Sequence, residues 1–168
     1  EDDILVLGNL IKLIAMYKNA GKNNEAIEKC KLFIEIQNQN ASENAKSDGK
    51  SWKHRLFVDS SNLDDTIGWE ETLQVYDTLA ELLIHENNVD EARFYLDEAL
   101  LKIPDTEEAA ESFGMIYIIQ IYDLLVQISD GTERSKAKEG LEKYFKQYFH
   151  QAQELSEQLS YLIVKYIE

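Results

Sequence analysis

Apolar residues recur at helical spacing along most of the chain. The clearest stretch is residues 4–20, where one stripe holds Ile4, Leu7, Ile11 and Ile14, with Leu10, Leu13 and Tyr17 beside it. This spacing places the apolar side chains on one face of an α-helix. The chain has one Pro and 7 Gly among 168 residues, so few positions would interrupt a helix. The pattern therefore predicts an all-α protein.

The first two predicted helices form an antiparallel hairpin over about residues 4–37. Gly21 stands where the first helix should end, because glycine tolerates the left-handed backbone found at many helix C-termini. Asn23 or Asn24 can cap the second helix, since an Asn side-chain oxygen accepts hydrogen bonds from the free N–H groups of a first turn. The second helix would turn its apolar and small residues inward: Ala26, Ile27, Cys30, Phe33 and Ile34.

Two more hairpins follow the same pattern, over about residues 65–103 and 106–149. Pro104 ends the second hairpin, because proline cannot continue a helix. A final helix over about residues 151–167 has one apolar face and is otherwise polar, which suits a helix that caps the end of a stack. These elements predict one helical domain over residues 1–168.

A long loop is predicted between the first two hairpins, over about residues 38–64. Residues 37–50 are polar and rich in Asn and Ser. Residues 51–60 read SWKHRLFVDS and mix aromatic and basic side chains, with Trp52, Lys53, Arg55 and Phe57 as candidate contact residues. Three roles remain open for this segment: docking on the chain's own acidic surface, contact with another subunit, or an anchor that holds the loop down.

Two distant segments of the chain share a pattern. Residues 17–30 read YKNAGKNNEAIEKC and residues 84–96 read IHENNVDEARFYL, each with Asn-Asn, a short gap and Glu-Ala. The offset between the two segments is close to twice the roughly 34-residue unit of tetratricopeptide repeats. Other motif positions are filled by Leu13, Tyr17, Gly21 and Ala26, then by Leu79, Ala80, Ala92, Leu96, Ala99 and Pro104. In the third hairpin, Leu124, Leu125, Gly131, Ala137 and Leu141 fit if the turn is one residue longer.

The chain therefore resembles the tetratricopeptide repeat (TPR) family over about 100 residues. It departs from the family at Phe33, where a small residue is expected, at Asn38, where Pro is expected, and in the roughly 30-residue insertion after the first hairpin. The resemblance implies a short α-solenoid of stacked hairpins with a C-terminal capping helix. It also implies a concave groove, lined by the outgoing helix of each hairpin, that holds an extended or helical peptide.

Carried onto this chain, the groove is predicted at Ile11, Ala15, Lys18, Asn19, Gln74, Asp77, Glu81, Ile84, His85, Tyr122 and Val126. Some family members hold a C-terminal carboxylate with basic and amide side chains at such positions. Here Ile11 and Ala15 replace a Lys-Asn pair, and the acidic Asp77 and Glu81 would repel a carboxylate. A basic or amphipathic segment is the better ligand. Alternatively, several of these residues merely pack within the stack.

The net charge of −15 is unevenly distributed. Residues 73–131 hold 13 acidic and 2 basic residues, a net charge of −11, whereas residues 132–168 balance at 6 and 6. Such a surface disfavours duplex nucleic acid and anionic membranes and is compatible with a basic partner, or simply with a solvated face. No apolar run reaches about 18 residues, so no membrane span is expected.

Nothing in the sequence marks catalytic chemistry, and no enzyme, cofactor or metal site is expected. The three histidines, His54, His85 and His150, have no metal-ligand spacing among themselves or with Cys30. No glycine-rich phosphate-binding loop is present. Cys30, the single cysteine, is interpreted as a small buried helix residue, and the absence of disulfide pairs favours an intracellular setting.

The predicted function is therefore a non-enzymatic protein–protein interaction module. Because the chain begins with Glu1, we expect it to be a fragment of a larger cytoplasmic or nuclear protein. Two alternatives remain open: a peptide-sensing regulatory domain and a dedicated chaperone for a basic client protein. The sequence leaves the partner and the oligomeric state undetermined.

Overall fold

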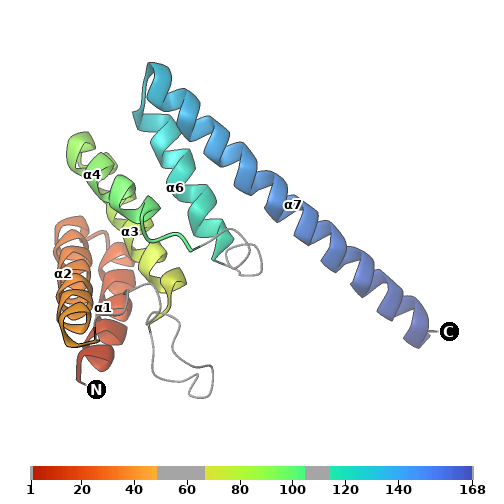
Figure 1. Cartoon of the computed structure of the whole chain (residues 1–168), viewed down its shortest axis with the longest axis horizontal. Helices are drawn as coiled ribbons and strands as arrows, with labels where there is room; N and C mark the ends of the chain where they lie inside the picture. Colours follow the sequence, from red (N-terminus) through yellow and green to blue (C-terminus); the bar gives the residue numbers. More distant parts are fainter. Residues whose placement is uncertain (1, 49–66, 105–113, 168) are drawn as a thin grey trace. The chain divides into compact units, whose positions relative to one another are not determined.

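The structure, a computed structural model, describes residues 2–48, 67–104 and 114–167, with side chains over narrower ranges (Figure 1). Every regular element in these ranges is an α-helix, which confirms the all-α prediction. The helices are α1 (Asp2–Asn19), α2 (Asn23–Asp48), α3 (Trp69–His85), α4 (Val89–Leu100), α6 (Met115–Ile128) and α7 (Gly131–Ile167). The chain has two compact units, Glu1–Ile103 and Pro104–Glu168, and each is described by itself below.

The first unit contains two antiparallel helix pairs. Helix α1 packs against α2 and α3 packs against α4, while α2 also packs against α3 and so joins the two pairs. The core includes the large fully buried side chains Tyr76, Phe33, Leu73, Leu79 and Leu96. Four alanines are fully buried between the helices, Ala26, Ala80, Ala92 and Ala99. Small side chains at these contacts allow the helix axes to approach closely.

The turns of the two hairpins have the same backbone structure. Gly21 and Asn87 both have positive φ, +68° and +60°. The next residue in each turn donates its N–H to a carbonyl of the preceding helix, Lys22 to Tyr17 at 2.9 Å and Asn88 to Leu83 at 2.8 Å. This pattern is the Schellman ending of a helix, in which a left-handed residue lets the backbone satisfy the last carbonyls. The correspondence of Gly21 with Asn87 defines the register that we call the hairpin repeat.

The hairpin repeat corrects one interpretation of the sequence. The two Asn-Asn pairs look equivalent but are out of register, because Asn87 takes the position of Gly21 rather than that of Asn23. Asn is among the residues that most readily replace Gly in the left-handed conformation. The Glu-Ala pairs that follow are truly equivalent, because Ala26 and Ala92 begin the helical bonding to the carbonyls of Lys22 and Asn88.

The loop predicted after the first hairpin begins at residue 38, but the chain is still helical there. Helix α2 continues to Asp48, so residues 38–48 of the predicted loop are helical. These residues contain no Pro or Gly, and their polar composition marks a solvated helix as readily as a loop. The rest of the predicted loop, including Trp52, Lys53, Arg55 and Phe57, lies outside the described residues.

In the second unit, α6 packs against α7. A separate capping helix from about residue 151 was predicted, but α7 is one continuous helix over Gly131–Ile167, because no Pro or Gly stands near residue 150 to end it. The turn between α6 and α7 is Ser129–Asp130, shorter than the lengthened turn that the repeat motif required. The start predicted for this hairpin, residues 106–113, lies outside the described residues.

Candidate partner-binding surface

The groove residues predicted on the first unit all lie at the protein surface. Helix α1 carries Ile11, Ala15 and Lys18 on one face, followed by Asn19, and α3 carries Gln74, Asp77 and Glu81 on one face, followed by Ile84 and His85. Ile11, Gln74, Asp77 and Ile84 are half-buried, and the other five are exposed. None belongs to the buried core, so packing inside the stack does not account for the exposed ones.

The structure brings three of these residues together, and we call them the Lys18 cluster: Lys18, Asp77 and Glu81. The Lys18 ammonium of α1 forms an ion pair with the Glu81 carboxylate of α3 at 2.5 Å. Burial, and to a smaller extent the neighbouring Glu81, raises the pKa of Asp77 to about 7, although Lys18 acts in the opposite direction. Asp77 is therefore a carboxyl group that is only partly ionised near neutral pH.

The contacts within the Lys18 cluster reduce the negative charge that the sequence predicts for the groove. Lys18 already neutralises Glu81, and Asp77 is partly protonated near neutral pH. In the hairpin repeat, the equivalents of Asp77 and Glu81 are Ile11 and Ala15. Among the predicted groove residues of the first unit, the acidic side chains thus lie only on α3. Because Lys18 is paired with Glu81, a second carboxylate would have to compete with Glu81 for its charge.

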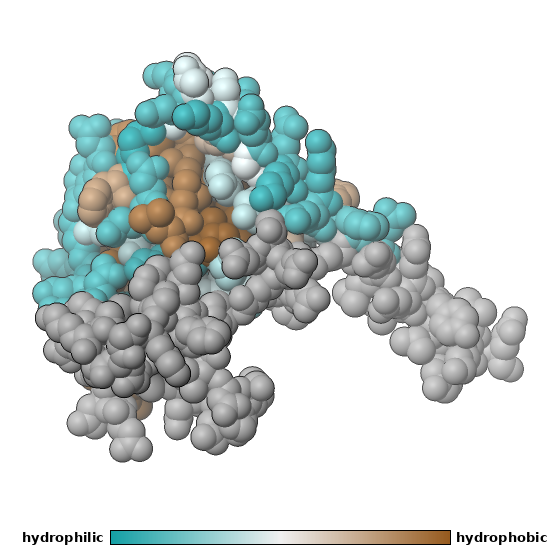
Figure 2. Space-filling model, viewed as in Figure 1, coloured by the Kyte–Doolittle hydropathy of each residue, from teal (hydrophilic) through white to brown (hydrophobic). Residues whose placement is uncertain are grey.

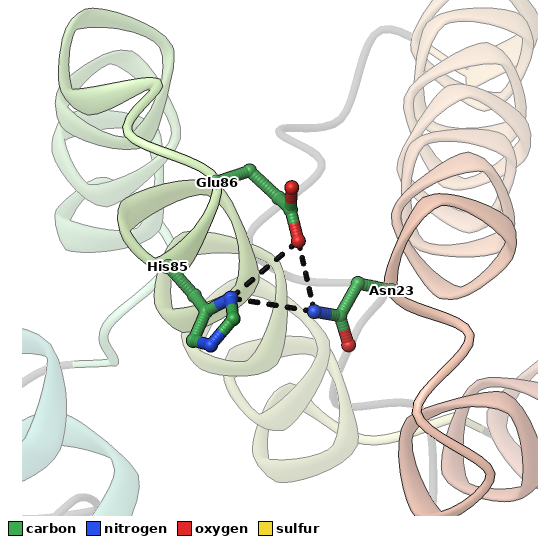
Figure 3. Close-up of polar contacts among 3 residues, drawn as sticks. All are labelled: Asn23, His85 and Glu86. Carbon is green, nitrogen blue, oxygen red and sulfur yellow. Dashed lines mark hydrogen bonds and ion pairs between the residues drawn. The ribbon is translucent and has the colours of Figure 1, made fainter.

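A second group, the turn cluster, joins the beginning of α2 to the end of α3. The Asn23 side-chain amide donates to Glu86 Oε1 at 2.9 Å and lies 3.4 Å from His85 Nδ1 (Figure 3). The hydrogen bond from Asn23 and the contact with His85 lower the pKa of the Glu86 carboxyl. Asn23 or Asn24 was predicted as the helix cap, but both lie within α2, and the Asn23 side chain instead bonds the other hairpin.

Further polar contacts link the two hairpins. Lys31 of α2 forms an ion pair with Glu91 of α4, and Lys102 donates to Asn38 at 3.0 Å. Basic groups of the first hairpin thus face acidic groups of the second, at Lys18–Glu81 and Lys31–Glu91. Part of the acidic charge of the second hairpin is therefore neutralised by basic residues of the first hairpin. These pairs connect residues that are far apart in the sequence, which a sequence pattern does not reveal.

In the second unit, the predicted residues Tyr122 and Val126 are half-buried on α6. The Tyr122 ring stacks on Tyr144 of α7, with ring centroids 5.7 Å apart. It also covers Gly140, where an added Cβ atom would collide with the ring. Tyr122 is thus a packing residue of the α6–α7 pair.

The described residues offer no group of three or more His, Cys, Asp or Glu side chains that could hold a metal ion. Cys30 is fully buried, as predicted, and burial raises the pKa of its thiol to about 12, so it is an unreactive core residue. Within the same part of the chain, no helix has the length and apolar character needed to cross a bilayer. Hydrophilic residues cover much of the described surface in the view of Figure 2.

Comparisons with known proteins give no relative: no family model matches the chain, and no curated protein or solved structure matches it. The functional argument therefore depends on the geometry of the molecule itself.

Proposed function

We propose that the first unit is a TPR-like stack of two hairpins and that it acts as a non-enzymatic interaction module. The proposal is supported by the matching turns at Gly21 and Asn87 and by the position of α2, which packs against both α1 and α3. In a stack of this kind each hairpin buries one face of the next, and the outgoing helices line a shared surface. Here the outgoing helices are α1 and α3. An intracellular location remains part of this proposal, on the basis of the single cysteine.

The partner that best fits the α1–α3 surface is a basic or amphipathic protein segment. The observation that carries this choice is Asp77, a half-buried carboxyl group with a pKa of about 7 that lies beside Glu81 and Lys18. A Lys or Arg side chain placed next to Asp77 would stabilise its ionised form and lower its pKa. Partner binding would then release a proton, so affinity should increase as pH rises toward neutrality.

Affinity purification followed by mass spectrometry tests the proposal. The wild-type chain is compared with Asp77→Lys/Glu81→Lys, which inverts the charge of the surface. Asp90→Lys/Asp97→Lys is the matched control, because it makes the same charge change at two exposed positions of α4. We expect the first variant alone to lose the partner. Identical partner lists for the wild type and both variants would rule out the acidic surface as the binding site.

The acidic surface of the second hairpin also favours a second candidate, a chaperone for a strongly basic client. Residues 69–100 contain nine acidic residues and one basic residue, and only some of the carboxylates have partners in the first hairpin. A chaperone of this type binds by distributed charge, so both double variants should weaken it. Its affinity should also fall steeply with salt. A groove-specific interaction should be lost only in Asp77→Lys/Glu81→Lys.

A further inference from the structure

Helix α1 exposes an apolar face on the side away from the core. The exposed fractions are 69% for Leu5, 43% for Val6, 36% for Leu13 and 66% for Met16. These residues lie close together around the helix, opposite the buried Leu7 and Ile14. We call Leu5, Val6, Leu13 and Met16 the α1 outer face. It is separate from the Lys18 cluster, which occupies another side of the helix.

The hairpin repeat allows the exposed positions of the α1 outer face to be compared with the equivalent positions of α3. Val6, Leu13 and Met16 correspond to Thr72, Leu79 and Leu82 of α3. In α3 the same positions are buried, with exposed fractions of 3%, 0% and 5%.

Helix α2 is the element seated on this face of α3. The two helices pack against each other, and the Gln37 amide of α2 donates to the Thr72 hydroxyl at 2.7 Å. The covered face of α3 and the open face of α1 are thus two copies of one surface.

A charged position at the edge of the surface repeats in the same way. Glu91 of α4 pairs with Lys31 of α2, which belongs to the covering helix. The equivalent of Glu91 in the first hairpin is Glu25, whose side chain is exposed and forms no ion pair with another described residue. A helix seated on α1 as α2 is seated on α3 would bring a basic side chain to Glu25.

We propose that the α1 outer face is a docking surface for an amphipathic helix supplied by another protein. That helix carries an apolar row, as α2 does with Ile27, Cys30 and Ile34, and a Lys or Arg positioned to meet Glu25. A second copy of this chain does not supply it, because the matching row of α2 is already buried inside its own unit. The surface adds a second contact to the groove proposed above, and it does not depend on that groove.

The probe for the test is a fluorescently labelled peptide with the sequence of residues 23–40, which is the part of α2 that carries this row and Lys31. It is titrated against the full chain under reducing conditions and followed by fluorescence anisotropy. We expect saturable binding. Met16→Lys should weaken it at least about tenfold, because a charge would have to be buried under the helix. Leu101→Lys is the matched control at a position exposed to 73%, and it should leave the affinity unchanged.

A charge exchange tests the register of the docked helix. Glu25→Lys should weaken binding about threefold, the scale of one exposed ion pair. A peptide carrying Lys31→Glu should recover that loss with the Glu25→Lys chain and bind the wild-type chain less well. Recovery would confirm that the peptide sits on α1 in the position that α2 has on α3.

Several results would overturn the proposal. One is the absence of saturable binding up to about 1 mM peptide, beyond which a specific contact has little meaning. Another is equal affinity of the wild type and Met16→Lys. A third is a dimer in sedimentation equilibrium that Met16→Lys dissociates, since the occupant would then be a second copy of the chain. Failure of the charge exchange alone would overturn the assigned register.

Discussion

The two hairpins of the first unit share a backbone plan but differ in what their equivalent positions face. Leu79 is fully buried, whereas its equivalent Leu13 is 36% exposed. Asp77 lies beside Lys18, whereas its equivalent is the uncharged Ile11. The comparison teaches that one repeated sequence pattern produces either core or surface, depending on whether another helix covers it.

The largest expected difference between the two hairpins is in how much the equivalent leucines, Leu79 and Leu13, contribute to stability. Leu79→Ala should reduce the free energy of unfolding by about 3 kcal/mol, because it leaves a cavity in the core. Leu13→Ala at the equivalent position should cost less than about 1 kcal/mol. Urea unfolding followed by tryptophan fluorescence measures both, since Trp69 is buried in the first unit. Equal losses would show that α1 is covered in solution and would contradict its exposed face.

The next difference is the ionisation of Asp77. The pKa of this carboxyl is about 7 in the folded state and 3.8 without the protein environment, so the folded state binds more protons between these values. Stability should therefore decrease as pH rises from about 4 to 7 and level off above, by about 1 kcal/mol after allowance for solvent screening.

Asp77→Ile, which gives α3 the residue of α1, should remove this part of the pH dependence. Urea unfolding of both proteins at several pH values is the measurement. Parallel pH profiles for the wild type and Asp77→Ile would show that Asp77 ionises normally in the folded protein.

Substitutions at the two left-handed turn residues, Gly21 and Asn87, should change the free energy of unfolding by smaller amounts and with opposite signs. Gly21→Ala should destabilise by about 1 kcal/mol, because a Cβ atom disfavours positive φ. Asn87→Gly should instead stabilise by a few tenths of a kcal/mol, about the preference of Gly over Asn in this conformation. Thermal unfolding by circular dichroism separates the two variants. A loss at Asn87→Gly would mean that the Asn side chain contributes beyond its backbone.

The smallest expected effect is that of the ion pair between the hairpins. Lys31 and Glu91 are each about a third exposed, so their coupling should be about 0.2–1 kcal/mol and should decrease with added salt. A double-mutant cycle of Lys31→Ala and Glu91→Ala measures it. Lys146 and Glu142, which form a more exposed pair within α7, provide the control and should show weaker coupling.

The sequence allowed the all-α class and the pairing of α1 with α2 and of α3 with α4 to be predicted, whereas the register of the hairpin repeat was recognised from the turns at Gly21 and Asn87. Apolar spacing determines the helices, and short turns determine antiparallel pairing. The end of α2 was misplaced because a polar helix and a polar loop have the same composition. Among the site residues, the surface position of Asp77 was predicted, but its approach to Lys18 was not, since that contact depends on how α1 and α3 lie together. The hydrogen bond from Asn23 to Glu86 was not predicted either, because it depends on how α2 and the end of α3 lie together.

The buried cysteine makes the molecule a convenient reporter of its own motions. Cys30 is the only thiol in the chain, it is fully buried, and its pKa is raised to about 12. A thiol reagent can therefore react with it only when the packing of α2 opens. The rate of that reaction counts opening events at the centre of the first unit, in the native state and without denaturant. Any ligand that seats on this unit should slow it.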